Sequence, residues 1–217
     1  MHSLLFPTTV VDNFLTDPHE YVNLANSLEF FSDPQGRWPG LRTENLVEKY
    51  PNMVHRLVEK IMSIYYNFDN ESLNWNVISC FQKVNSSYVE GWVHGDETVL
   101  SSIIYLCDSG FGTSLYKPKD ISKFESIINR EQKFDSYKNP EKILEYTSHR
   151  IENNSQFEKS LTVDSQFNRM FCFEGGNFHG VDNFRNPENN FERLTLVLFI
   201  THVTPSKSFP IQRVKFK

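Results

Sequence analysis

Apolar residues in the first third of the chain recur every three or four positions, the spacing of an amphipathic α-helix. One helix is expected to begin after Asp17, because Asp17 suits the N-cap, Pro18 the first helical position and Glu20 the third. A second helical region runs from about Thr43 to Tyr66 and is divided by Pro51. Both regions carry one apolar face, so we expect these helices to pack on a sheet.

From Leu73 onward the spacing changes to alternation, which is typical of β-strands. A short edge-type strand is also expected at the start of the chain, in residues 6–15. Further strands are expected at 75–83, 88–94, 99–107, 113–116, 161–173, 178–181 and 191–203, with a turn at 182–190. Many short strands after N-terminal helices predict an α+β protein that is mainly β, with a barrel-like core.

A polar stretch from Lys117 to Lys159 interrupts the predicted strands. Of its 43 residues, 9 are basic and 8 are acidic, so it is highly charged and nearly neutral. Ile121, Phe124 and Ile128 fit one amphipathic helix, and Asn139 precedes another. A solvated helical insertion is the simpler interpretation of these charges, and a lid over a substrate opening is the alternative.

The composition favours a single folded domain over residues 1–217. Hydrophobic residues make up 39% of the chain and aromatic residues 14%, enough for a substantial core, which excludes a disordered protein. Residues 1–72 are expected to provide an N-terminal strand and helical support. Residues 73–203 are expected to form the β-rich core, with the polar insertion at 117–159.

Charge and cysteine content restrict the partners and the compartment. A net charge of −5 lacks the concentrated basic surface of a general nucleic-acid binder, so nucleic acid is not expected as a partner. The N-terminus does not resemble a secretory signal and no run of about 18 apolar residues occurs, so we expect a soluble, cytoplasmic protein without membrane contact. Cys80, Cys107 and Cys172 lie in apolar runs, as expected of buried, reduced thiols.

Candidate chemistry lies where His94 and Asp96 precede a strand-like run. Residues i and i+2 of an extended chain point to one face, so this imidazole and carboxylate should converge. His179 lies downstream among strand-like residues, and Arg193 follows it across a turn that can place the two side by side. Two histidines and one carboxylate on one face of a metal form the triad of non-haem Fe(II) oxygenases. The remaining histidines have no such context: His2, His19, His55, His149 and His202.

These residues, in this order, resemble the 2-oxoglutarate- and Fe(II)-dependent oxygenases, particularly the prolyl-hydroxylase-like branch and its compact bacterial and phage members. His94-Gly95-Asp96 matches the H-x-D pair of that family, and His179 matches its distal histidine. Arg193-Leu194-Thr195 matches the R-x-S/T element that holds the far carboxylate of 2-oxoglutarate, and Tyr105 matches a tyrosine that often reaches the same carboxylate. The resemblance covers most of the chain outside residues 117–159.

The resemblance implies a double-stranded β-helix of the jelly-roll or cupin-like type, with the N-terminal helices on one sheet. It also implies Fe(II) and 2-oxoglutarate as cofactor and co-substrate, together with O2 and, as an optional reductant, ascorbate. The metal would be held by His94, Asp96 and His179, and 2-oxoglutarate by Arg193, Thr195 and Tyr105. Because related halogenases leave the carboxylate position empty, Asp96 favours hydroxylation over halogenation.

One position of the co-substrate pocket stays open. Val84 stands where some prolyl hydroxylases carry a second tyrosine that binds the co-substrate, and Phe81 or Tyr88 could line the pocket instead.

The implied activity is hydroxylation of a protein or peptide side chain, with proline as the leading example, and release of succinate and CO2. A small-molecule or free amino-acid hydroxylase is the alternative within the class. A non-catalytic jelly-roll binding protein is the alternative outside it, and the acidic balance disfavours a nucleic-acid demethylase. The sequence does not indicate an oligomeric state.

Overall fold

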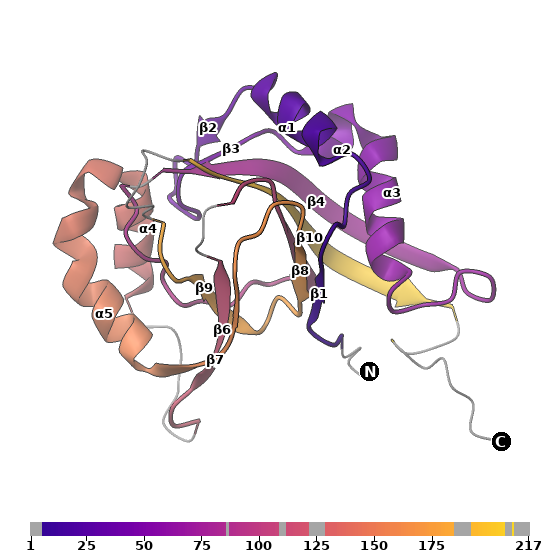
Figure 1. Cartoon of the computed structure of the whole chain (residues 1–217). Coiled ribbons are helices and arrows are strands. Elements are labelled where there is room, and N and C mark those ends of the chain that lie inside the picture. The colour runs from indigo at the N-terminus through magenta and orange to yellow at the C-terminus, as the bar shows by residue number, and fades with distance from the viewer. Residues whose placement is uncertain are drawn as a thin grey trace.

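Antiparallel strands dominate the structure (Figure 1). The computed structural model describes residues 6–85, 87–108, 112–121, 129–184, 192–206 and 210. The strands are β1 (Thr9–Val11), β2 (Phe31–Ser32), β3 (Leu41–Arg42), β4 (Leu73–Val84), β5 (Leu100–Tyr105), β6 (Thr113–Pro118), β7 (Phe157–Val163), β8 (Met170–Phe173), β9 (Phe178–Val181) and β10 (Arg193–Pro205). They form a seven-stranded sheet in the order β1-β8-β5-β10-β4-β3-β2 and a three-stranded sheet in the order β7-β6-β9. The mainly β class expected from the sequence is confirmed.

The helices form two groups along the chain. They are α1 (Pro18–Asn26), α2 (Leu46–Lys49), α3 (Pro51–Met62), α4 (Arg130–Lys138), the 3-10 helix η1 (Pro140–Tyr146) and α5 (Thr147–Ser155). Asp17 caps α1 by accepting hydrogen bonds from the backbone N–H groups of His19 and Glu20, as predicted. Pro51 begins α3 and separates it from α2, because proline suits a first helical position and not a helix interior.

The N-terminal helices cover one face of the larger sheet (Figure 1). Helix α3 buries its apolar face, which includes Leu57 and Ile61, against sheet residues such as Phe81, Ile104 and Leu196. Burying a large apolar side chain stabilises the fold by about 1.5–3 kcal/mol, so this layer contributes substantially to stability. Because side chains alternate along a strand, the remaining residues of these strands point to the opposite face of the sheet.

The opposite face of the larger sheet meets the smaller sheet. Tyr105, Phe171 and Phe173 of the larger sheet pack with Leu115 and Val163 of the smaller one. Strand β10 contributes every second residue to this face, because side chains alternate along a strand. The space between the two sheets is therefore lined by residues from both halves of the chain.

The predicted strand at 88–94 is wrong. Residues 88–93 are irregular, and His94 makes only an isolated bridge with His179. Side-chain amides from α5, together with backbone groups of β9, occupy the hydrogen-bonding groups that a strand partner would use. The segment is held in an extended path without joining a ladder.

Two further boundaries differ from expectation. Strand β7 begins at Phe157, four residues earlier than predicted and inside the expected insertion, because it pairs with β6 along its whole length. Most of the predicted helix around Phe124 lies outside the described residues, and Ile121 lies in a turn with 83% exposure. Most of the predicted turn at 182–190 also lies outside them.

The three cysteines are buried, as predicted, and no disulfide joins them. None of the helices in the described part of the chain is both long and apolar enough to cross a membrane.

Candidate metal centre

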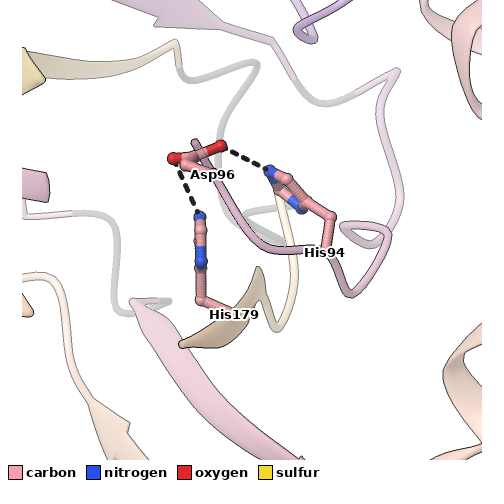
Figure 2. A group of neighbouring side chains, drawn as sticks. All are labelled: His94, Asp96 and His179. Atoms are coloured by element: carbon pink, nitrogen blue, oxygen red, sulfur yellow. Dashed lines mark ion pairs between the residues drawn. The ribbon is translucent and has the colours of Figure 1, made fainter. Parts of the chain in front are cut away.

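His94, Asp96 and His179 come together between the two sheets (Figure 2). One ligand atom from each residue lies within 4.8 Å of the other two. His94 Nε2 lies 3.7 Å from Asp96 Oδ1, and His179 Nε2 lies 3.5 Å from Asp96 Oδ2. Charge-assisted hydrogen bonds are typically about 2.7–2.9 Å long, so the three groups converge without forming tight direct pairs. This spacing suits donors that share one ion.

Both imidazole rings are oriented by the main chain. His94 Nδ1 donates to the backbone oxygen of Trp92 at 2.8 Å, and His179 Nδ1 donates to that of Asn177 at 2.8 Å. A carbonyl oxygen can only accept, so the proton of each neutral ring lies on Nδ1. Each Nε2 therefore presents its lone pair toward Asp96, which is the form that binds a metal.

Backbone hydrogen bonds hold the two ligand segments together. The backbone N–H of His94 donates to the oxygen of His179 at 3.0 Å, and the reverse bond measures 2.7 Å. The N–H of Asp96 donates to the oxygen of Gly175 at 2.7 Å. Gly175 has no space for a side chain, because a Cβ there would lie 1.8 Å from Thr98 Oγ1. The turn that supports Asp96 therefore requires glycine.

Helix α5 completes the support of this segment with two side-chain amides. Asn154 Oδ1 accepts from the backbone N–H of Val93 at 2.8 Å, and its Nδ2 donates to Gly91 O at 3.0 Å. Asn153 Nδ2 donates to Val93 O at 3.0 Å. The amide of Asn154 thus imitates a neighbouring strand immediately ahead of His94.

The electrostatics of the triad favour a neutral imidazole beside an ionised carboxylate. Burial lowers the pKa of His94 well below its usual value, and the nearby charge of Lys133 acts in the same direction. Burial alone would raise the pKa of Asp96, but interactions with His179, His94 and Lys133 outweigh it and hold that pKa below its usual value. Nitrogen lone pairs and a carboxylate are the donors that a divalent cation needs.

The residues predicted to bind 2-oxoglutarate lie close together. Arg193 is 5% exposed, and its guanidinium carbon lies 5.2 Å from the centre of the Tyr105 ring. Thr195 lies on the same face of β10 and is the Cα partner of Tyr105. Arg193 Nη2 donates to Thr113 Oγ1 at 3.4 Å, and Tyr105 Oη donates to the same oxygen at 3.1 Å.

Two polar atoms of this group lack partners among the described residues. Arg193 Nε and Thr195 Oγ1 are buried without a hydrogen bond there. A buried, unsatisfied polar group is costly, and a bound ligand is one way to satisfy it. Thr113 was not singled out from the sequence, because its role depends on contacts across two sheets.

A cavity of about 660 Å³ connects the triad with Arg193 and Thr113, whereas Tyr105 and Thr195 are not among its lining residues. His94, Asp96 and His179 line it, and so do Arg193 and Thr113.

Of the three positions left open by the sequence, only Val84 lines the cavity. Phe81 belongs to the core beneath the helices, and Tyr88 packs edge-on against Tyr137 and Phe184.

The remaining histidines do not join the triad. His2 lies outside the described residues. The others have partners of their own, which are Phe167 for His19, Trp75 and Glu59 for His55, Tyr146 for His149 and Thr204 for His202.

Several solved structures have a fold similar to that of this chain. HygX from Streptomyces hygroscopicus, with nickel, 2-oxoglutarate and hygromycin B bound, is 10% identical, with a TM-score of 0.56 over 89% of this chain and 82% of that one. The 2-oxoglutarate-dependent carbocyclase SnoK from nogalamycin biosynthesis is 9% identical, with a TM-score of 0.50 over 89% and 78%. AviO1 from Streptomyces viridochromogenes Tue57 is 12% identical, with a TM-score of 0.51 over 91% and 90%. At these identities the likeness shows the fold alone, which this chain shares with proteins that bind or depend on 2-oxoglutarate, such as HygX and SnoK.

The chain belongs to a family of unknown function, DUF6445, whose sequence profile matches residues 5–200. A comparison with curated proteins finds no match.

Proposed function

We propose that this protein is an Fe(II)- and 2-oxoglutarate-dependent oxygenase built on a double-stranded β-helix. The observation that carries the proposal is the convergence of two imidazole Nε2 atoms on one carboxylate, with both rings oriented by main-chain carbonyls. The fold likeness to enzymes such as HygX supports it, since the HygX structure holds nickel and 2-oxoglutarate.

The residues present fit the metal and its co-substrate. His94, Asp96 and His179 would hold Fe(II) through two neutral nitrogens and one anionic oxygen, leaving ligand positions open. When bound, the iron and 2-oxoglutarate together supply the oxidising chemistry, in which O2 is consumed and 2-oxoglutarate is converted to succinate and CO2.

Arg193 would bind the far carboxylate of 2-oxoglutarate. Its guanidinium is permanently charged and planar, so it can donate two parallel hydrogen bonds to a carboxylate. Thr113 and Tyr105 hold this guanidinium in place. The unpartnered Oγ1 of Thr195 offers a further donor on the same strand face.

Apolar side chains around the triad would exclude water from the reaction. The Phe173 ring lies 4.8 Å from the ring of His179, and Trp92 and Val93 are almost fully buried beside His94. A dry site limits side reactions of oxidising species and strengthens the electrostatic interactions within it.

The size of the cavity favours a small organic molecule as the substrate. A volume of about 660 Å³ falls within the range of small-molecule sites. HygX, whose structure holds hygromycin B, offers a parallel of the same kind. We therefore rank hydroxylation of a small molecule above hydroxylation of a peptide side chain such as proline.

The decisive experiment measures succinate formed from labelled 2-oxoglutarate by protein reconstituted with Fe(II). We expect slow, iron-dependent turnover even without substrate, and its loss in His179→Ala. His55→Ala is the matched control, because His55 is exposed and pairs with Glu59 away from the triad. Stimulation by small-molecule or peptide pools would then rank the two substrate classes.

The alternative hypothesis, that the protein binds a metal without catalysing a reaction, predicts a different result. Mn(II) would bind to the triad, but no iron-dependent succinate would form in the wild type. That outcome would contradict the proposed function.

A further inference from the structure

A second guanidinium lines the cavity that contains the triad. Arg42, on β3, lies with its guanidinium carbon 4.5 Å from the centre of the Trp38 ring and 5.1 Å from that of Phe199. Cation–π contacts of this kind hold a guanidinium in place. Arg42, Trp38 and Phe199 all belong to the cavity wall.

The hydrogen-bonding capacity of this group is largely unused among the described residues. Arg42 Nη2 donates to Gln82 Oε1 at 3.4 Å, which is long, and Arg42 Nε has no partner. The indole Nε1 of Trp38 is also buried without a partner. The N–H groups of Arg42 Nε and Trp38 Nε1 are thus both available to a hydrogen-bond acceptor.

Its neighbour Arg37 provides a contrast. Arg37 also lies over Trp38, at 4.9 Å, but it forms a two-point ion pair with Asp33 at 2.9 and 3.0 Å. No ion pair joins Arg42 to a carboxylate in the described part of the chain. Arg37 therefore has a direct ion-pair partner, whereas Arg42 has none among the described residues.

Arg42 is separate from the group proposed for 2-oxoglutarate. Arg193 contacts Tyr105 and Thr113, whereas Arg42 contacts Trp38, Gln82 and Phe199. The two arginines share none of these contacts. Of the three arginines that line the cavity, Arg37, Arg42 and Arg193, the last two thus have no ion-pair partner among the described residues.

The other arginines that line the cavity already have a role or a partner. Among the described residues of the wall, Arg37 pairs with Asp33, and Arg193 belongs to the group proposed for 2-oxoglutarate. Arg42 is the lining arginine that has neither.

We propose, on the basis of the proposed function, that the substrate is a small molecule bearing one carboxylate, which binds to the edge of the Arg42 guanidinium between Trp38 and Phe199. Both rings contact the guanidinium and Arg42 Nε has no partner among the described residues, so its N–H groups remain for a ligand. A planar carboxylate matches that edge. The adjacent rings would contact apolar atoms of the same molecule.

The test compares an acid with its neutral amide. Affinities for 4-phenylbutyrate and 4-phenylbutyramide are measured calorimetrically, with and without Mn(II) and 2-oxoglutarate. We expect the wild type to bind the acid about 10- to 100-fold more tightly, the range for a hydrogen bond to a charged group. The preference should disappear in Arg42→Gln and be reduced in Arg42→Lys, which keeps the charge and loses the planar donor.

The double variant Arg37→Gln/Asp33→Asn is the matched control, because it removes a cation beside the same indole without leaving a lone charge. It should retain the preference. Thermal unfolding checks that each variant is folded. If Arg42→Gln does not fold, the loss of the preference is measured in Arg42→Lys instead.

Three results would overturn the inference. These are equal or absent binding of acid and amide by the wild type, a preference that survives in Arg42→Gln, and loss of 2-oxoglutarate binding in Arg42→Gln but not in Arg193→Gln. Failure of the proposed function would give a different result, because Mn(II) and 2-oxoglutarate would then bind to none of the proteins. The comparison of acid and amide binding without metal would still test the role of Arg42.

Discussion

The guanidinium of Arg193 is buried beside hydroxyl groups instead of a carboxylate. Such an arrangement leaves its charge available to a ligand. Arg193→Lys would keep the charge but lose the planar pair of donors, so we expect the KM for 2-oxoglutarate to rise about 10- to 100-fold. Steady-state succinate formation measures this change. Arg37→Lys is the control, and an unchanged KM in Arg193→Lys would refute the assignment.

The sequence was sufficient to identify His94 and Asp96 as a pair, because residues two apart in an extended segment point to one side. It was not sufficient to identify Thr113 or Arg42. Thr113 bridges Tyr105 and Arg193 from another sheet. Arg42 contacts Phe199 of β10 because β3 pairs with β4 and β4 pairs with β10. Such contacts depend on tertiary structure.

At the scale of elements, α5 acts as a strand partner for the segment before His94. Asn154→Ala would remove both hydrogen bonds to Gly91 and Val93. We expect metal affinity to fall about tenfold, as when groups that orient metal ligands are lost. Titration with Mn(II) measures the effect.

Asn139→Ala is the matched control for that experiment, because the Asn139 amide only donates to Asp135 O within the same helical region. Equal affinities of the two variants would show that α5 does not position the ligands.

Helix α4 carries a buried lysine whose charge is unfavourable. Burial lowers the pKa of Lys133 from 10.5 to about 8, although Asp96 acts in the opposite direction. The unfolded chain therefore binds more protons than the folded chain between about pH 8 and 10.5, so stability should rise with pH across that window. This difference between the pKa of Lys133 in the unfolded and the folded chain corresponds to about 3 kcal/mol in the free energy of unfolding.

Lys133→Met should remove this dependence in the metal-free protein and raise the free energy of unfolding at pH 7. Urea unfolding at pH 7 and pH 10 provides the measurement. A wild-type protein that gains no stability relative to Lys133→Met over this range would contradict the prediction.

The helices between β6 and β7 show where pattern reasoning fell short. Their many charges favoured a solvated insertion, yet Lys133, Arg150 and Asn153 are buried and the last of these supports the ligand segment. A count of charges gives the composition of a segment and not the direction of each side chain. The position of α4 and α5 beside the triad is therefore a tertiary property.

At the scale of the whole molecule, the site joins residues that are far apart in the sequence. The metal triad draws on the segment before β5 and on β9, and Arg193 begins β10. Binding at such a site requires the folded state, so ligands should stabilise the protein. At 100 times the dissociation constant the gain is about 2.7 kcal/mol.

For a chain of 217 residues, this gain corresponds to a rise in Tm of roughly 5–10 °C. We expect that shift with Mn(II) and 2-oxoglutarate in the wild type, and none in His179→Ala. A thermal scan measures it, and an equal shift in both proteins would place the ligands elsewhere.

The mainly β class and the order of most elements were predictable, because hydrophobic spacing is a local property. The division into a seven-stranded and a three-stranded sheet was not, since it depends on pairings such as β1 with β8 across most of the chain. The irregular path of residues 88–93 escaped prediction for the same reason.

The carbonyl groups that orient both imidazoles belong to the peptide backbone at Trp92 and Asn177. Every amino acid carries that oxygen, so a point substitution at either position cannot delete it. Over evolutionary time, substitutions in the pocket lining can therefore change substrate specificity while the orientation of the two imidazole rings is kept.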